Sequence, residues 1–183
     1  MKISYPHTVA GTTGEKITFL NSYIKDGVEI LEGEVEVQPQ AGPPMHTHHK
    51  QDESFTSVSG TMAYQILGHE VKYAYPGETV LIKAGIPHKF WNPGPDLLKC
   101  KSYVNPPDNF VYFLTELYRS INENKGKPSL YDGAFLLTHF KSEFAMHDIP
   151  PFVQKFTFPT VLFFGKLTGK NRKFRHAPTS VPA

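Results

Sequence analysis

Residues 42–60 read GPPMHTHHKQDESFTSVSG, and this stretch combines closely spaced histidines with a change of chain direction. Side chains alternate between the two faces of a β-strand, so His46 and His48 are expected to point to one face. His49 is the main rival for a place in a metal site, because it neighbours His48. Strand alternation turns it to the opposite face, which favours the pair His46 and His48.

Two further ligands are expected from outside this pair. Glu53 can join the histidines if the chain turns between Lys50 and Asp52, and the polar sequence there allows such a turn. His88, in the run GIPHKFWN, must arrive from a separate strand. Three neutral imidazoles and one carboxylate suit one divalent transition metal ion, namely Fe, Mn, Ni, Co, Cu or Zn, better than Ca or Mg. An ion preferring five or six ligands would keep positions open for water or substrate.

The spacing of these residues resembles that of a known family. His46-x-His48-x4-Glu53-x6-Gly60 resembles the first conserved motif of the cupins, and Gly77-x5-Lys83-x-Gly85-x2-His88-x3-Asn92 resembles the second. The resemblance implies an antiparallel jelly-roll barrel, also called a double-stranded β-helix, with His46, His48, Glu53 and His88 as its metal ligands. Two positions depart from the pattern: Lys83 replaces the usual proline, and Gln40 replaces the usual first glycine.

The rest of the N-terminal half is typical of an all-β fold. Residues 15–37 alternate around a turn at Lys25–Gly27, Ser59–Gly60 is expected to join two strands as a tight hairpin, and a last strand is expected near 97–104. The 16 prolines and 14 glycines fit many short strands separated by turns. We therefore predict a cupin domain over residues 1–105 and a helical C-terminal extension over 106–183.

The extension should contain two helices and a run of aromatic residues. Apolar residues at three- and four-residue steps predict a helix from a cap at Asp108 or Asn109 to Gly126, and a second helix is expected over 132–146. Prolines at 150, 151 and 159 should allow only short helical pieces afterwards. The aromatic segment 152–167 should pack on the outside of the barrel or on a second subunit, so a homodimer is expected. Docking on a membrane, with the basic tail on the headgroups, is the less favoured alternative.

Charge and composition restrict location and partners. The net charge of +2 divides into −3 for residues 1–100, with eight lysines and eleven acids, and +5 for 101–183, with eleven basic residues and six acids. We interpret the basic tail as a solvated segment, because no nucleic-acid-binding motif accompanies it. Cys100 is the only cysteine, so no internal disulfide forms, and the N-terminus lacks a signal-peptide pattern. A cytoplasmic protein is expected.

The neighbours of the expected metal suggest a small-molecule substrate. An apolar pocket without nearby arginine favours a flat aromatic substrate over a sugar phosphate. Eight residues are candidates for the pocket wall: Met45, Phe55, Tyr64, Ile66, Leu81, Phe90, Trp91 and Tyr103.

Three functions remain open at this point. The sequence PPMHTHHKQDESF is similar to the corresponding stretch of quercetinase-like cupin dioxygenases. This resemblance implies dioxygenase activity on an aromatic or enolisable substrate, with Glu53 as metal ligand and catalytic proton acceptor. A non-catalytic module that binds or senses a small molecule is the alternative. A third hypothesis is a closed structural metal site, since four protein ligands can complete a tetrahedral shell.

Overall fold

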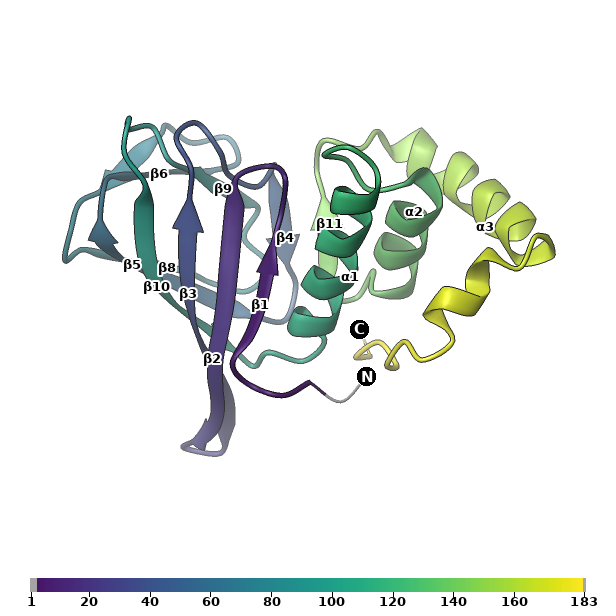
Figure 1. Ribbon diagram of the computed structural model, residues 1–183, viewed down its shortest axis with the longest axis horizontal. Coiled ribbons are helices and arrows are strands. Elements are labelled where there is room, and N and C mark those ends of the chain that lie inside the picture. Colours follow the sequence, from purple (N-terminus) through teal and green to yellow (C-terminus); the bar gives the residue numbers. More distant parts are fainter. Residues whose placement is uncertain (1–2, 183) are drawn as a thin grey trace.

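A computed structural model describes residues 3–182 and divides the molecule into a β-sheet part and a helical part (Figure 1). One sheet has six strands in the order β1-β2-β3-β10-β5-β8, and the other has five in the order β11-β4-β9-β6-β7. The strands are β1 His7–Ala10, β2 Glu15–Lys25, β3 Val28–Val37, β4 His46–His48, β5 Asp52–Ser59, β6 Met62–Ile66, β7 Lys72–Ala74, β8 Thr79–Ile82, β9 His88–Trp91, β10 Leu98–Asn105 and β11 Phe144–Met146.

The two sheets pack face to face around an apolar core, as the predicted jelly roll requires. Phe55 and Leu98 from the six-stranded sheet meet Met62 and Phe90 from the five-stranded sheet, and all four are nearly inaccessible to solvent. Among residues 3–182, strand pairing does not join the two sheets into one closed hydrogen-bonded barrel. The prediction of an antiparallel β fold with a helical extension is confirmed.

Local sequence explains one predicted turn and corrects another. Asp26 and Gly27 both have positive φ, which gives β2 and β3 the tight turn expected there. The predicted hairpin at Ser59–Gly60 is wrong, because β5 and β6 lie in different sheets. Gly60 has a φ of 82° and its chain lies against the backbone of Leu98, so it marks a corner where the chain crosses between sheets.

The first helix follows the sequence expectation, whereas the second is shorter. Helix α1 spans Phe110–Glu123 with Asn109 at its N-cap position, but the Asn109 side chain donates to Glu143 and does not cap the helix. Helix α2 spans Leu130–His139 and ends before the predicted residue 146. The last three residues of that range form β11, which pairs with β4. Helical periodicity could not reveal this pairing, because β4 lies nearly 100 residues earlier.

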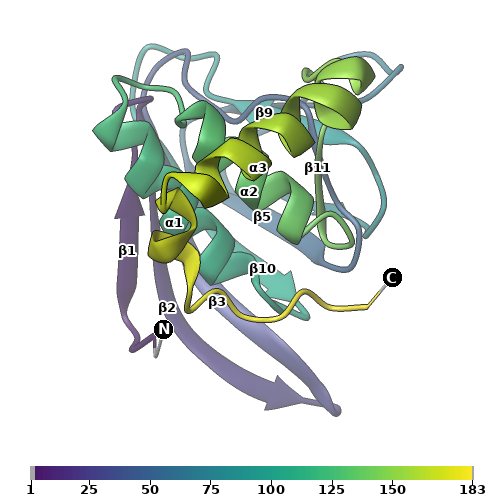
Figure 2. The ribbon, with the colours of Figure 1, turned by 90° about the vertical axis from the view of Figure 1, so that its right-hand side faces the viewer.

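The C-terminal segment forms a continuous helical run and ends in an irregular tail. A π-helical turn, Val153–Thr157, leads directly into helix α3, Phe158–Leu167, and a 3₁₀ turn, Lys170–Phe174, follows. Pro159 lies in the first turn of α3, where a missing N–H is tolerated. The helices form a layer beside the sheets, with α1 against β1 and α3 packed on α2 (Figure 2). Within residues 3–182, no helix combines the length and the apolar character needed to cross a bilayer.

Candidate metal centre

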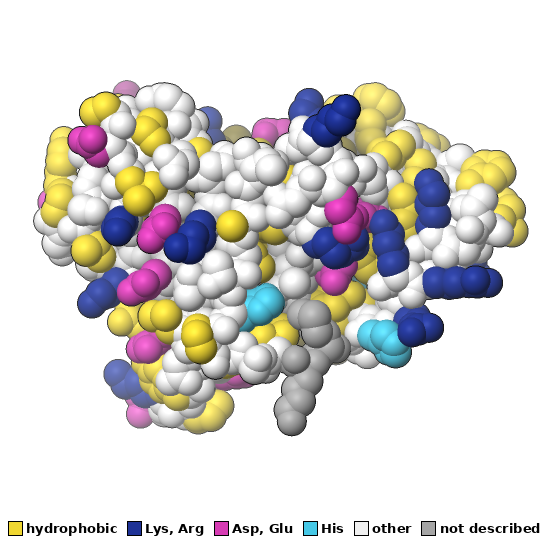
Figure 3. Space-filling view, in the orientation of Figure 1, with side chains coloured by type: hydrophobic (Ala, Val, Ile, Leu, Met, Phe, Trp, Pro, Cys, Tyr) yellow, Lys and Arg dark blue, Asp and Glu magenta, His cyan; other side chains and the backbone are white. Residues whose placement is uncertain are grey.

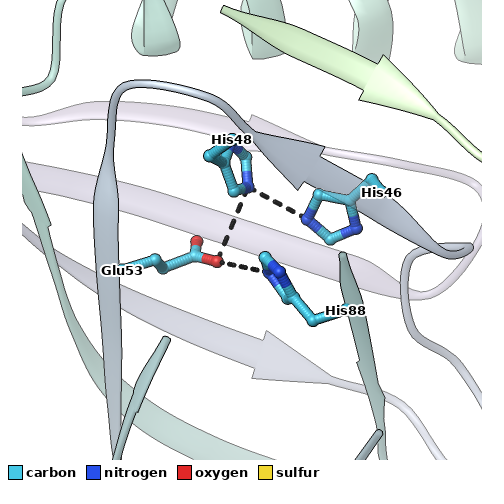
Figure 4. A group of neighbouring side chains, drawn as sticks. All are labelled: His46, His48, Glu53 and His88. Atoms are coloured by element: carbon cyan, nitrogen blue, oxygen red, sulfur yellow. Dashed lines mark hydrogen bonds and ion pairs between the residues drawn. The ribbon is translucent and has the colours of Figure 1, made fainter. Parts of the chain in front are cut away.

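The four predicted ligands come from both sheets and converge in the space between them. His46 and His48 lie on β4, and His46 is paired directly with His88 of the neighbouring strand β9. Glu53 lies on β5 in the other sheet, after bends at His49 and Lys50. The turn expected between β4 and β5 therefore carries the chain from one sheet to the other. Figure 4 shows all four side chains directed toward a common centre.

The distances between the donor atoms fit a single ion. His46 Nε2 lies 3.0 Å from His48 Nε2, and Glu53 Oε2 lies 3.2 Å from His88 Nε2 and 3.6 Å from His48 Nε2. All four donor atoms lie within 4.8 Å of one another. Ligands about 2.1 Å from a metal are separated by about 3.0 Å at a right angle and about 3.4 Å at a tetrahedral angle. The cluster could therefore bind a transition metal ion, whose identity these distances do not determine.

Backbone carbonyl groups orient two of the imidazoles. His46 Nδ1 donates to the Pro44 carbonyl oxygen at 2.9 Å, and His88 Nδ1 donates to the Ile86 carbonyl oxygen at 2.8 Å. A carbonyl oxygen only accepts, so each Nδ1 carries the hydrogen and each Nε2 of the neutral ring presents a lone pair to the centre. His48 differs, because its buried Nδ1 has no hydrogen-bond partner among the described residues. Nitrogen lone pairs that face one another repel, and a cation bound between them turns this arrangement into a favourable one.

Burial keeps the imidazoles of His46 and His48 neutral, which is the form that binds metal. Desolvation, followed by the charges of the neighbouring imidazoles, lowers the pKa of His46 to about 3. Desolvation likewise lowers the pKa of His48 to about 4. Burial alone would raise the pKa of Glu53, but its interactions with the side chains of His48, His88 and His46 outweigh burial and hold this pKa below its ordinary value. The centre therefore offers neutral nitrogens and an ionised carboxylate near neutral pH. His49 is exposed and lies outside the cluster.

Two backbone features explain how the chain accommodates its departures from the cupin pattern. Gln40 has a φ of 63°, so the position usually held by glycine does require a left-handed conformation. Gly42 lets the loop approach β9, because a Cβ atom there would lie 2.2 Å from the Phe90 carbonyl oxygen. Lys83, at the usual proline position, forms an ion pair with Asp52 at 2.7 Å. This pair connects the loop before β9, which carries His88, to the start of β5, which carries Glu53.

Comparison with known proteins supports the same family. Residues 33–102 match the family model described as Cupin domain, and this range contains all four candidate ligands. The β-sheet part has the cupin fold. None of the curated proteins matches the chain.

Several solved structures are similar to part of this chain. KdgF from Halomonas sp. is 16% identical, with 57% of this chain and 92% of that chain covered and a TM-score of 0.48. A sugar phosphate isomerase from a cupin superfamily, from Silicibacter pomeroyi, is 18% identical over 50% and 59% of the two chains, with a TM-score of 0.42. Ectoine synthase from P. lautus is 15% identical over 54% and 68%, with a TM-score of 0.43. These similarities describe the fold and assign no activity to this chain.

A cavity of about 310 Å³ extends from the metal centre of the cupin domain toward the helical extension. Inward-facing residues of β2 and β3 form one wall, and α1 and β11 form the opposite one. The lining residues of the C-terminal extension are apolar apart from the Tyr118 hydroxyl and Lys127: Phe110, Phe113, Leu114, Leu117, Tyr118, Ile121, Gly126, Lys127, Pro128, Phe144, Ala145 and Met146. The extension therefore helps to build the binding cavity of the cupin domain, a role that its sequence did not reveal.

The cavity includes only part of the predicted pocket wall. Phe55 and Phe90 line it, whereas six candidates lie outside its lining: Met45, Tyr64, Ile66, Trp91, Leu81 and Tyr103. Met45 and Trp91 each adjoin an inward-facing residue, so strand alternation turns them away. Tyr64 and Ile66 pair with inward-facing residues of β9, but the cavity extends toward α1 and not toward β6. Leu81 and Tyr103 are 55% and 37% exposed.

Glu15 is the functional candidate that the sequence reading missed. Glu15 is 7% exposed and lines the cavity, and its carboxylate interacts with the Tyr118 side chain of α1. Desolvation, with a smaller contribution from the charge of Glu53, raises the pKa of Glu15 to about 7. The signal was present in the sequence, because Glu15 shares one strand face with Ile17 and Phe19, where an apolar residue is expected.

Proposed function

We propose that this cupin is a metal-dependent dioxygenase that acts on a small aromatic or enolisable substrate. The observation that carries the proposal is the opening of the ligand cluster into an apolar cavity, since His46, His48 and Glu53 all belong to its lining. A metal that only stabilises the fold requires no adjoining cavity, whereas catalysis requires a position that substrate can reach.

The cavity lining supports the proposed substrate class. Aromatic and aliphatic side chains dominate it, and Lys127 is the single Lys or Arg of the lining among residues 3–182. A phosphorylated sugar would need several cationic groups to replace its hydration, whereas a flat aromatic molecule needs contact with apolar side chains. An aromatic substrate with one ionisable hydroxyl or enol group fits this cavity, because the ionised oxygen would bind the metal and the rest of the molecule would contact the apolar side chains.

The chain's own residues would divide the chemistry between them. A bound transition metal supplies Lewis acidity and a site for dioxygen chemistry. His46, His48, His88 and Glu53 would hold that ion, and the phenylalanines of α1 would exclude water. A carboxylate that binds a cation is a weak base, which argues against a major proton-transfer role for Glu53. Glu15 has a pKa matched to neutral pH and is the better candidate to accept the substrate proton at its carboxylate oxygen, oriented by Tyr118.

Oxygen uptake after controlled metal loading tests the proposal. The purified protein would be stripped with a chelator, reloaded separately with Fe(II), Mn(II), Co(II), Ni(II), Cu(II) and Zn(II), and assayed with flavonols, catechols and 1,3-diketones. The expected result is metal-dependent oxygen consumption, with both atoms of labelled O₂ recovered in the products. Tight binding of these compounds without turnover would instead support the non-catalytic binding module. Retention of metal with neither binding nor turnover would contradict both.

A further inference from the structure

The helical run that ends in α3 presents an apolar surface to solvent. Five large side chains on it are between 59% and 69% exposed: Phe152, Phe156, Phe163, Phe164 and Leu167. The aromatic segment was expected to pack on the barrel or on a second subunit; within the chain it packs on α2 and leaves these residues exposed. A contiguous exposed apolar surface of this kind marks a site of interaction with another molecule or with a membrane.

The exposed residues form a stripe along the helical run. Phe152 and Phe156 lie four residues apart at the π-helical turn, and Phe163 and Leu167 lie one turn apart on α3, so each pair shares a face of its own helical segment. The opposite face is fixed to the protein. Its Gly165 is buried against α2, where a Cβ atom would lie 1.9 Å from Cε2 of Tyr131. Rotation of the helix to hide its phenylalanines would break this close contact.

The chain segment that carries the stripe is rich in positively charged residues. Residues 149–182 contain six Lys and Arg residues and no Asp or Glu. Lys155 on the π-helical turn and Lys166 on α3 are exposed beside the stripe in sequence, and the exposed Lys170 and Arg172 extend the charge beyond Leu167. Lys173 is the member of this group that pairs with the buried Asp132. Figure 3 shows hydrophobic side chains at the helical end of the molecule with Lys and Arg side chains beside them.

We propose that this surface, composed of the phenylalanine stripe and Lys155, Lys166, Lys170 and Arg172, docks the protein on an anionic phospholipid membrane. The helix would lie in the plane of the interface, with its aromatic side chains among the acyl chains and its lysines at the headgroups. Aromatic burial and attraction to anionic lipids act together in interfacial helices of this type. Each Lys or Arg near such a surface contributes about 1 kcal/mol.

The charge distribution favours a lipid surface over a second copy of the chain. A two-fold dimer apposes the same patch of both subunits, so two surfaces of the same positive net charge would face each other. Like charges across an interface are unfavourable, whereas an anionic bilayer complements them. The proposal is independent of the dioxygenase activity, because the stripe lies on the far side of α2 from the cavity (Figure 1).

Vesicle co-sedimentation of the full chain tests the proposal. The protein should sediment with vesicles of phosphatidylcholine and phosphatidylglycerol, and much less with phosphatidylcholine alone. Neutralising three lysines, by Lys155→Gln, Lys166→Gln and Lys170→Gln together, should weaken binding on the order of 100-fold. The matched control, Lys25→Gln, Lys72→Gln and Lys101→Gln, removes equal charge from the exposed surface of the sheets and should leave binding within about twofold.

The apolar half of the surface has its own test. Replacement of Phe152, Phe156 and Phe163 by Ser should abolish sedimentation, whereas replacement of the equally exposed Ile24, Tyr73 and Leu81 by Ser should not. A Phe163→Trp reporter in a Trp91→Phe background should show a blue-shifted emission on the anionic vesicles, independently of sedimentation. Failure of the wild-type chain to bind either vesicle would overturn the proposal. So would a concentration-dependent dimer in light scattering that the Phe→Ser variant abolishes, or nucleic-acid binding by the three lysines without vesicle binding.

Discussion

The cupin sheets and helix α1 both contribute apolar side chains to one cavity, and they differ in the polar groups that they supply to it. The sheets contribute the polar donors His46, His48 and Glu53, whereas the helix contributes an apolar wall with Tyr118 as its polar group. The sheet donors are positioned by short-range strand alternation and by one cross-strand pair. The wall depends on the packing of a helix far along the chain. We infer that metal chemistry and ligand selection are separable, and substitutions on the two sides should have different effects.

The largest effect is expected on the sheet side. His48→Ala should remove stoichiometric metal, with affinity reduced by at least about 100-fold, because loss of even an outer-shell partner costs about 10- to 100-fold. His49→Ala is the matched control, since His49 is exposed and should leave the metal bound. Metal analysis after gel filtration measures both. If the His49 variant lost its metal and the His48 variant kept it, the assignment of His48 to the face of β4 that bears the ligands would be wrong.

The Glu15–Tyr118 pair connects the two sides and should affect rate without affecting metal. If Glu15 accepts the substrate proton, Glu15→Gln should lower kcat/KM on the order of 100-fold. The wild-type rate should rise with pH through about 7, as the Glu15 carboxyl loses its proton, and the variant should lose this rise. Tyr118→Phe should shift the profile while keeping most of the rate. An unchanged pH profile in Glu15→Gln would exclude this role.

Glu15 should also make stability depend on pH. Its pKa is raised from 4.5 to about 7 by folding, so the folded state retains a proton that the unfolded state loses over this range. The free energy of unfolding therefore has its full value below pH 4.5, where Glu15 is protonated in both states. It falls by about 3 kcal/mol as the pH rises to about 7, because only the unfolded state releases the proton over this range. Glu15→Gln should remove that loss. Urea unfolding at both ends of the range should show the variant gaining stability relative to wild type at the higher pH.

On the helical side, Gly165→Ala should destabilise the packing of α3 on α2. The added methyl group overlaps the Tyr131 ring, and overpacking of this kind costs about 1–3 kcal/mol. Metal content should remain unchanged, because the centre lies in the cupin domain. Thermal unfolding and metal analysis of the same preparation test the separation of the two sides. Loss of metal in this variant would show that they are coupled.

The smallest effect is expected from Gln40→Gly in the loop before the first ligand strand. Gln40 has a left-handed backbone conformation, which glycine adopts without strain. Relief of that strain is offset in part by the greater freedom of glycine in the unfolded chain, so a gain of up to about 1 kcal/mol is expected. Urea unfolding measures it. Destabilisation would indicate that the Gln40 side chain, which donates to the Pro93 carbonyl oxygen, matters more than the strain.

The candidate metal ligands could be predicted from the sequence because their arrangement depends mainly on short-range geometry. Two histidines two residues apart share a strand face, and the glycine positions around them need only short-range geometry. The limits were topological: Ser59–Gly60 has the composition of a hairpin turn but crosses between sheets. Residues 144–146 continue an apolar pattern after α2, and only the distant strand β4 explains their β conformation. Glu15 shows a different limit, since its position in an apolar strand face was visible but its partner on α1 was not.

Strand β11 has a consequence for attempts to isolate a minimal cupin. It covers the outer edge of β4, so the strand that carries His46 and His48 has a neighbour on both sides. A chain cut at residue 105 would leave the N–H and C=O groups of that edge without their partners, and uncapped edges invite pairing between molecules. The boundary suggested by composition is therefore a poor place to truncate: the recombinant fragment should precipitate, or pair with itself, before its metal can be assayed.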